Sequence, residues 1–417
     1  MIGIHSLRGL PKCVWLLFAA DLVNSTGYFV LPFLTILLTD RMGMGSAEAG
    51  MYLAAANVAY GPGSMLGGKL ADHFGRKRVY VGARVLAALT LMSCAMLGRS
   101  PLVPWIVIGS ILASSATEPA VSAMVADVTP PGQRQAAFSL VYLGRNLGFA
   151  VGPILAGLMY RTHPAWLFVG DGLTSIAAAV LVMLWIPETL PAAGASSDVP
   201  EADAEQPEAG GVIAALWRRP WMLVFAVALS AYTLVYVQCV FGLPLQVNAL
   251  FAGDGPARYG ALMSVNAVAV IVLTAPLVRL TGRMATTRRL VLGGIAYMAG
   301  FGSIFLLRTM PLLVLSTVIW SVGEVLVATN SRVFIADNAP SSHRGRFNAA
   351  VNLLAGGGYV IGPLVGGVLI ARMGMESLWK ACLLIAMGAS ALMLLPAWMG
   401  RGRMVDGGDR ALTHSGR

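Results

Sequence analysis

The sequence GGKLADHFGRKRV, residues 67–79, is a short stretch rich in glycine and charge that separates two long apolar stretches. The same alternation extends in both directions along the chain. Of the 417 residues, 57% are hydrophobic and only 12% are charged, and the mean hydropathy is +0.73. This composition lies outside the range of soluble domains. The sequence therefore predicts an integral membrane protein.

Apolar runs of about 20 residues, the length of a helix that crosses the hydrocarbon core, recur along almost the whole chain. A transmembrane β-barrel would need short strands of alternating polarity, and these runs do not alternate. We expect an all-α membrane protein with twelve transmembrane helices, at residues 13–38, 47–70, 79–98, 102–126, 135–160, 165–186, 220–247, 258–280, 289–307, 311–336, 347–371 and 376–399.

The net charge of +10 follows the predicted membrane topology. If both termini are cytoplasmic, most of the Lys and Arg residues lie in or beside cytoplasmic segments, as the positive-inside rule requires. A nucleic-acid or anionic-lipid site is the alternative explanation for the basic excess. We expect a multi-pass protein of the inner (cytoplasmic) membrane, with both termini in the cytoplasm and no nucleic-acid partner. The four cysteines are scattered singly, so they predict neither a disulfide nor a metal framework.

A segment rich in Pro, Ala, Ser and acidic residues begins after the sixth apolar run and predicts a flexible linker. The expected organisation is an N-terminal six-helix bundle (1–186), a cytoplasmic linker (187–219), and a C-terminal six-helix bundle with a short cytoplasmic tail (220–417). An internal repeat supports this division, because a shift of 210 residues aligns Asp127 with Asp337 and Gly152-Pro153 with Gly362-Pro363. Parallel repeats of this kind occur in secondary transporters, with the binding site at the midplane.

At this point the chain resembles the major facilitator superfamily over its whole length. The stretch at residues 67–79 matches that family's signature G-x-L-A-D-x-x-G-R-K at Gly68, Leu70, Ala71, Asp72, Gly75, Arg76 and Lys77. The resemblance implies two pseudo-symmetric six-helix bundles and a cytoplasmic latch at this loop. In that latch the aspartate lies near a helix N-terminus of the other bundle, where a carboxylate is favoured. A purely basic topology marker would account for Arg76 and Lys77 but not for Asp72 and Gly75.

A second motif of the family lies in the fifth predicted helix, where GFAVGPILAG nearly fits the pattern G-x-x-x-G-P-x-x-G-G of the antiporters. It is formed by Gly148, Gly152, Pro153 and Gly157, with Ala156 in place of one glycine. Small residues at this spacing let another helix backbone approach closely, and proline permits a bend. Tight packing alone would explain the pattern, so efflux is implied only by the resemblance.

Ionisable residues inside predicted helices are expensive to bury and are functional candidates by default. Glu118 and Arg145 lie about eight and ten residues from the cytoplasmic ends of their helices, so their depths agree within a turn. We expect Arg145 to pair with Glu118 or Asp21. The pair either is structural or opens when a proton or a cationic substrate arrives.

In the second half, Glu324 lies near the middle of the tenth predicted helix and is the deepest carboxylate. We expect it to bind protons or substrate, because burial favours the protonated carboxyl. Arg332, eight residues on, is nearer the cytoplasm and need not neutralise Glu324. Asp171 is expected to be structural, and Arg84 is expected to snorkel to the cytoplasm.

A set of polar and aromatic residues could line a central cavity, although core packing explains each equally well: Asn24, Tyr28, Tyr232, Tyr236, Gln238, Asn266 and Trp320. The fourth helix lacks the arginine that drug-exporting families often carry there, so a proton-transfer scheme based on that arginine cannot be carried over.

Enzyme activity is not expected, because the histidines have no metal-ligand spacing and no G-x-S-x-G elbow occurs. An ATP-driven pump is disfavoured as well, since GSMLGGKL has Leu70 where a phosphate-binding loop needs Ser or Thr. The sequence predicts a monomeric transporter without a cofactor, driven by the proton gradient, that exports small amphipathic or drug-like molecules by antiport. The alternatives are a proton symporter or metabolite facilitator and, least favoured, a membrane sensor that transports nothing.

Overall fold

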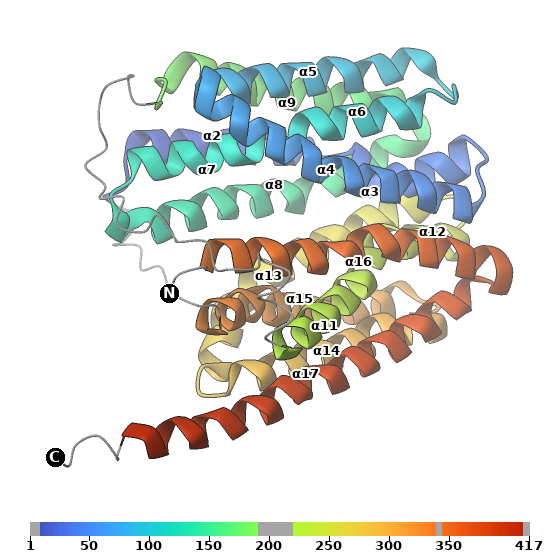
Figure 1. Ribbon diagram of the computed structural model, residues 1–417. Helices are drawn as coiled ribbons and strands as arrows, with labels where there is room; N and C mark the ends of the chain where they lie inside the picture. The colour runs from blue at the N-terminus through green and yellow to red at the C-terminus, as the bar shows by residue number, and fades with distance from the viewer. Residues whose placement is uncertain (1–8, 191–219, 339–343, 412–417) are drawn as a thin grey trace. The chain divides into compact units, whose positions relative to one another are not determined.

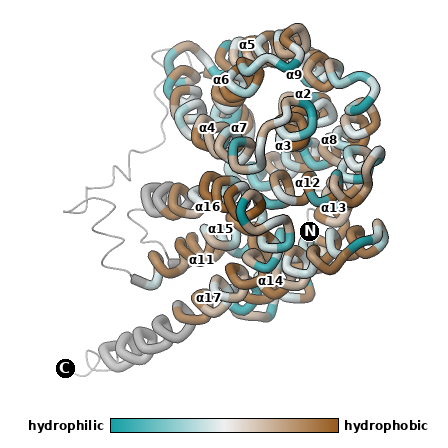
Figure 2. Tube along the Cα trace, turned by 90° about the vertical axis from the view of Figure 1, so that its right-hand side faces the viewer, coloured by the Kyte–Doolittle hydropathy of each residue, from teal (hydrophilic) through white to brown (hydrophobic). Residues whose placement is uncertain are grey.

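The computed structural model describes residues 9–190, 220–338 and 344–411, and the described residues form helices joined by short loops (Figure 1). Eleven helical stretches of this part are long and apolar enough to cross a membrane. The second of the twelve expected spans is a helix of 29 residues, α4 (Ser46–Phe74), and is not among the eleven. Hydrophobic residues line most helical turns (Figure 2). The expected all-α membrane fold is confirmed.

The first half of the chain forms the helices α2 (Lys12–Thr26), α3 (Val30–Ile36), a π-helical turn (Leu37–Arg41), α4, α5 (Arg76–Leu97), α6 (Val103–Ser115), α7 (Thr117–Val128), α8 (Arg134–Thr162) and α9 (Ala165–Trp185). The second half forms α11 (Pro220–Tyr236), α12 (Gly242–Leu250), α13 (Gly255–Thr281), α14 (Thr286–Gly300), a 3-10 turn (Phe301–Leu306), α15 (Met310–Asn338), α16 (Arg344–Met373) and α17 (Met375–Ala411).

Three of the expected membrane spans are interrupted, and each interruption has a proline just after it. The first span breaks between α2 and α3, four residues before Pro32; the fourth breaks between α6 and α7 just before Pro119; and the seventh breaks between α11 and α12 before Pro244. Proline lacks the N–H that would bond the carbonyl four residues back, and its ring clashes with that carbonyl. The sequence therefore determines where these helices break.

Two compact units emerge from the contacts. Of the described residues, the first contains 9–190, 238–271 and 363–374, and the second contains 220–237, 272–338, 344–362 and 375–411. In the first unit α2 packs on α8 and α9, and α5 packs on α9. In the second unit α14 packs on α15 and α17, and α11 packs on α17. The bundle boundaries expected from the sequence stay a prediction, and most of the expected linker, 191–219, lies outside the described residues.

Glycines of the repeat pack in matching ways in the two halves. Gly148 of α8 lies against Leu22 and Ser25 of the first span, and Gly358 of α16 lies against Ser230 and Thr233 of the seventh. A Cβ on either glycine would come within 2.6 Å or 2.2 Å of a backbone oxygen. Side chains larger than hydrogen are excluded, which explains why these positions recur 210 residues apart.

Farther along α8 and α16, the glycines of the repeat again pack in matching ways, here within the first unit. Gly157 lies against Pro256 and Ala257 at the start of α13, and Gly367 lies against Ser46 and Ala47 at the start of α4. The backbone of Pro153 approaches Gly260, and that of Pro363 approaches Gly50. Each glycine-proline segment thus packs on a helix of the opposite half, and the close-packing interpretation of this motif is confirmed.

Candidate functional site

Three charged side chains from three helices meet inside the first unit. Arg145 of α8 places Nη1 at 3.1 Å from Oε1 of Glu118 and Nη2 at 3.4 Å from Oδ2 of Asp21. The predicted pairing of Arg145 is confirmed, and it involves both carboxylates rather than one of them. We call Asp21, Glu118 and Arg145 the charge triad.

The helix packing brings the triad together. Gly144 and Gly148 let α8 lie against α2 at the carbonyls of Phe18 and Leu22, so Arg145 lies beside Asp21. Glu118 lies in the first turn of α7, directly after the break that Pro119 enforces. Two glycines and one proline therefore determine where the three charged side chains meet.

Burial differs sharply across the triad. The side chain of Asp21 is 4% exposed, whereas those of Glu118 and Arg145 are 41% and 45% exposed. A buried carboxylate without a partner costs several kcal/mol, so Asp21 depends on the guanidinium. One guanidinium faces two carboxylates, so the triad carries one net negative charge unless a proton or another cation joins it.

Asn24 and Tyr28 of the first span, and Asp171 of α9, make contacts outside the charge triad. Asn24 Oδ1 accepts a hydrogen bond of 3.0 Å from the hydroxyl of Ser175 on α9, and the ring of Tyr28 lies 6.1 Å from that of Phe149. Asp171, expected to be structural, accepts backbone N–H groups of Phe29 and Val30 at 3.2 Å each.

A second site lies in the second unit, around Glu324 of α15. The hydroxyl of Tyr236 on α11 donates to Oε1 of Glu324 at 2.9 Å. The Tyr236 ring also contacts the rings of Tyr297, Trp320 and Tyr359, with centroids 6.2 to 6.4 Å away. Glu324 and Tyr236 are half-buried and Tyr359 is 41% exposed, so this aromatic site is only partly buried.

The remaining candidates of the second half are mostly packed in cores. Tyr232 is fully buried and its hydroxyl lies 3.0 Å from that of Ser390, while Trp320 is fully buried and stacks on Phe301. Gln238 and Asn266 are buried in the first unit. Arg332 is exposed, and its expected position nearer the cytoplasm stays a prediction.

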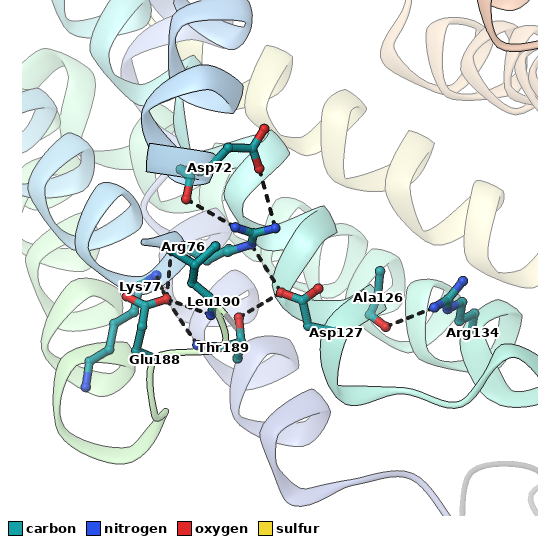
Figure 3. A network of polar contacts seen from close by, with 10 residues as sticks. Asp72, Arg76, Lys77, Ala126, Asp127, Arg134, Glu188, Thr189 and Leu190 are labelled. Atoms are coloured by element: carbon teal, nitrogen blue, oxygen red, sulfur yellow. Dashed lines mark hydrogen bonds and ion pairs between the residues drawn. The ribbon is translucent and has the colours of Figure 1, made fainter. Parts of the chain in front are cut away.

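The stretch at residues 67–79, which the sequence analysis treated as a loop between two spans, comprises the end of α4, Gly75 and the start of α5, and it carries a polar network (Figure 3). Arg76 bridges Asp72 at 3.4 Å and Asp127 of α7 at 3.2 Å. Gly75 joins α4 to α5 with φ of +108°, a conformation that L side chains rarely adopt. Gly68 has room beside Pro119. The latch residues therefore lie together, with Asp72 at the end of α4 bound to Arg76 at the start of α5.

Glu188, which follows α9, completes this network and was not among the sequence candidates. Its Oε1 accepts the backbone N–H groups of Arg76 at 2.8 Å, Lys77 at 3.3 Å, Thr189 at 3.0 Å and Leu190 at 3.2 Å. Partial burial acts to raise the pKa of Glu188, but these four donors outweigh it and lower the pKa below its ordinary value. The sequence signal that could have identified Glu188 is its position just after the expected end of the sixth span.

Comparisons with known proteins agree on one family. The model of the Major Facilitator Superfamily matches residues 16–310 and 251–413. An uncharacterized MFS-type transporter, YttB of Bacillus subtilis, is 26% identical over 93% of this chain and 95% of its own length. A Na(+), Li(+), K(+)/H(+) antiporter of Planococcus maritimus is 24% identical over 82% of this chain and 85% of its own. The multidrug resistance protein MdtH of Yersinia pestis is 25% identical over 88% of each.

Solved structures show the same fold. The nucleoside transporter NupG superposes with a TM-score of 0.72 at 17% identity, covering 93% of this chain and 99% of its own. The POT family transporter PepTSo superposes with a TM-score of 0.74 at 16% identity, covering 95% and 99%.

Proposed function

Because the chain belongs to the major facilitator superfamily, which makes it a transporter and not an enzyme, we propose that it is a proton-coupled antiporter. It exports small amphipathic or drug-like molecules across the inner membrane by alternating access. Its energy source is the proton gradient, it needs no cofactor, and it works as a monomer with both termini in the cytoplasm. The charge triad is the single observation that carries this proposal.

A coupled exchanger needs a buried group that binds a proton or a cation but not both at once. The triad supplies such a group, because two carboxylates share one guanidinium. Taking up one proton neutralises the triad, and losing it restores a negative charge inside the membrane, which is costly unless a cation replaces the proton. Arg145 can hold only one carboxylate strongly when the other is protonated, so proton binding changes which helices it ties together.

The aromatic site around Glu324 supports an amphipathic substrate. Aromatic ring faces attract cations, and a carboxylate beside them adds charge complementarity. Tyr236 donates to Glu324, and either a proton or a bound cation would compete for the same carboxylate. Glu324 is therefore proposed as the group that exchanges proton for substrate in the second half of the chain.

Efflux is supported by relatives rather than by packing. Two relatives are a multidrug resistance protein and a cation/proton antiporter. Packing within the first unit supports alternating access, because the Thr35 hydroxyl donates to the carbonyl of Val240 at 2.9 Å and that of Ser46 to Gly367 at 3.1 Å. With cytoplasmic termini these contacts lie toward the extracellular ends of their helices.

Reconstitution in liposomes that contain a pH dye tests the proposal. A pH gradient is imposed, and cationic, neutral and anionic compounds are added in turn, with Na⁺, Li⁺ and K⁺ as further arms. Proton movement opposite to that of a compound supports antiport. Movement of both in one direction supports the symporter alternative, and no movement with any compound favours the sensor. If only the metal cations exchange, the amphipathic substrate class is wrong.

A further inference from the structure

The break in the first membrane span leaves backbone groups that the helix cannot satisfy. After Thr26 the N–H groups of Gly27 and Tyr28 bond three residues back, to Asn24 and Ser25, and within the span that of Phe29 bonds two residues back, to Gly27. Pro32 explains the break, since a helix there would need an N–H from Pro32 to the carbonyl of Tyr28. Inside a bilayer such groups have no water to bond and must find protein partners.

Asp171 of α9 is that partner. Its Oδ2 accepts both Phe29 N–H and Val30 N–H at 3.2 Å, and the side chain is 9% exposed. The carboxylate thus replaces the acceptors that the helix loses at its break. A carboxylate buried in a membrane span costs free energy, so we expect Asp171 to have a specific role.

Other residues near Asp171 on α9 contact the first span on both sides of the break. Gly27 lies so close to Thr174 that a Cβ would overlap its hydroxyl, and Gly170 lies against the ring of Phe29. Ser175 donates to Asn24, three residues after Asp21 on α2. Four neighbouring residues of α9 therefore fix the position of the first span at its break.

We propose that Asp171 is a positioning residue that holds this break and thereby sets Asp21 opposite Arg145. The inference rests on the proposed function of the charge triad for its effect on transport, but not for its effect on the helix. Asp21 lies five residues before the end of α2 and is anchored by the triad on one side only. If α2 and α3 are released from α9, α2 can shift or rotate, and the 3.4 Å contact with Arg145 is lost.

Two measurements on the reconstituted full-length protein test this proposal. The first is hydrogen–deuterium exchange of peptides that contain residues 27–30. Asp171→Ala removes the acceptor of two N–H groups, so we expect their exchange to speed up about tenfold. Asp171→Asn keeps an acceptor oxygen, so exchange should stay near that of the unaltered protein. This readout does not depend on the substrate, so it separates failure of the hinge from failure of the proposed function.

The second measurement is a double-mutant cycle on the rate of proton-coupled transport. Asp171→Ala and Asp21→Asn should each lower the maximal rate by about tenfold, and the double variant should be no slower than Asp21→Asn alone, because both act through one contact. Asp40→Ala is the matched control, since Asp40 accepts a hydrogen bond from Tyr160 at the far end of the same span. It should change neither readout.

Three results would overturn the proposal. They are unchanged exchange at residues 27–30 in Asp171→Ala, additive losses in the double variant, and a loss in Asp171→Asn as large as in Asp171→Ala. If Asp171→Ala does not reach the membrane, Asp171→Asn decides alone: near-normal exchange and transport support the acceptor role, and a loss of both contradicts it.

Discussion

Arg145 lies within 3.4 Å of Asp21 and within 3.1 Å of Glu118, so one guanidinium joins the first, fourth and fifth membrane spans. Its repeat-related position, 355, is an alanine. Gly148, Gly152 and Gly157 of the same helix recur in the second half as Gly358, Gly362 and Gly367, whereas the charge does not. The triad is therefore an addition to the shared packing of the two halves, which is what a coupling device in one half requires.

Replacing Arg145 tests the role of the triad. Arg145→Met leaves Asp21 buried without its cation, so we expect proton-coupled transport in liposomes to fall by about tenfold or more. Adding Asp21→Asn to this variant should recover thermal stability but not transport. Persistence of both transport and proton coupling in Arg145→Met would show that the triad is only structural.

Glu324 is expected to be essential for coupling. Glu324→Gln keeps the shape and the hydrogen bond from Tyr236 but cannot release a proton, so pH-driven accumulation or extrusion should be abolished. Tyr236→Phe, which removes the hydroxyl alone, should weaken transport only severalfold and shift its pH dependence. Unchanged pH-driven transport in Glu324→Gln would count decisively against the proposed role.

Glu188 makes the polar network around Arg76 sensitive to acid. Its pKa is lowered in the folded state, so the stability it contributes is present above its ordinary pKa and is lost as the pH falls through the lowered value. Because Glu188 is exposed, we expect Glu188→Gln to lower the melting temperature at pH 7 by only about 1 to 3 °C. In melting curves recorded at decreasing pH, this difference should shrink below the ordinary pKa of about 4.3. A difference that grows with acid would contradict this assignment.

Close packing of the first span on α8 predicts a contrast between two glycines. Gly148→Ala would place a methyl group against Leu22 and Ser25, so we expect it to reduce the folded protein in the membrane and to lower its melting temperature. Gly109→Ala in α6 is the control, because nothing lies within 4 Å of the added Cβ. There alanine should be neutral or stabilising by up to about 1 kcal/mol. Equal stability of the two variants would refute the packing argument.

Much of the fold follows from the sequence because the bilayer restricts the possible structures. Apolar run lengths gave the spans, and the repeat predicted matching packing at Gly148 and Gly358. The depth of Arg145 along its helix identified its carboxylate partners. Residues that lie equally far along their helices from the same side of the membrane lie at the same depth, so they can meet. These inferences need only distances along straight helices.

What could not be predicted depends on contacts that straight helices do not have. Asp171 was expected to be structural, but its partners are N–H groups that become free only because Pro32 breaks the first span. Glu188 was expected to belong to the flexible linker, yet it bonds the backbone at the start of α5. The orientation of individual side chains could not be predicted either. Tyr232 and Tyr236 lie about one helical turn apart, but the hydroxyl of Tyr232 contacts Ser390 and that of Tyr236 contacts Glu324.

The most direct test of proton-coupled exchange is proton release on binding. A compound that moves protons in liposomes is added to the purified protein in weakly buffered detergent solution, and a pH dye reports the change. We expect binding to release protons from the unaltered protein, and we expect Glu324→Gln to bind the compound without releasing them. Binding without proton release by the unaltered protein, or equal release by Glu324→Gln, would contradict this expectation.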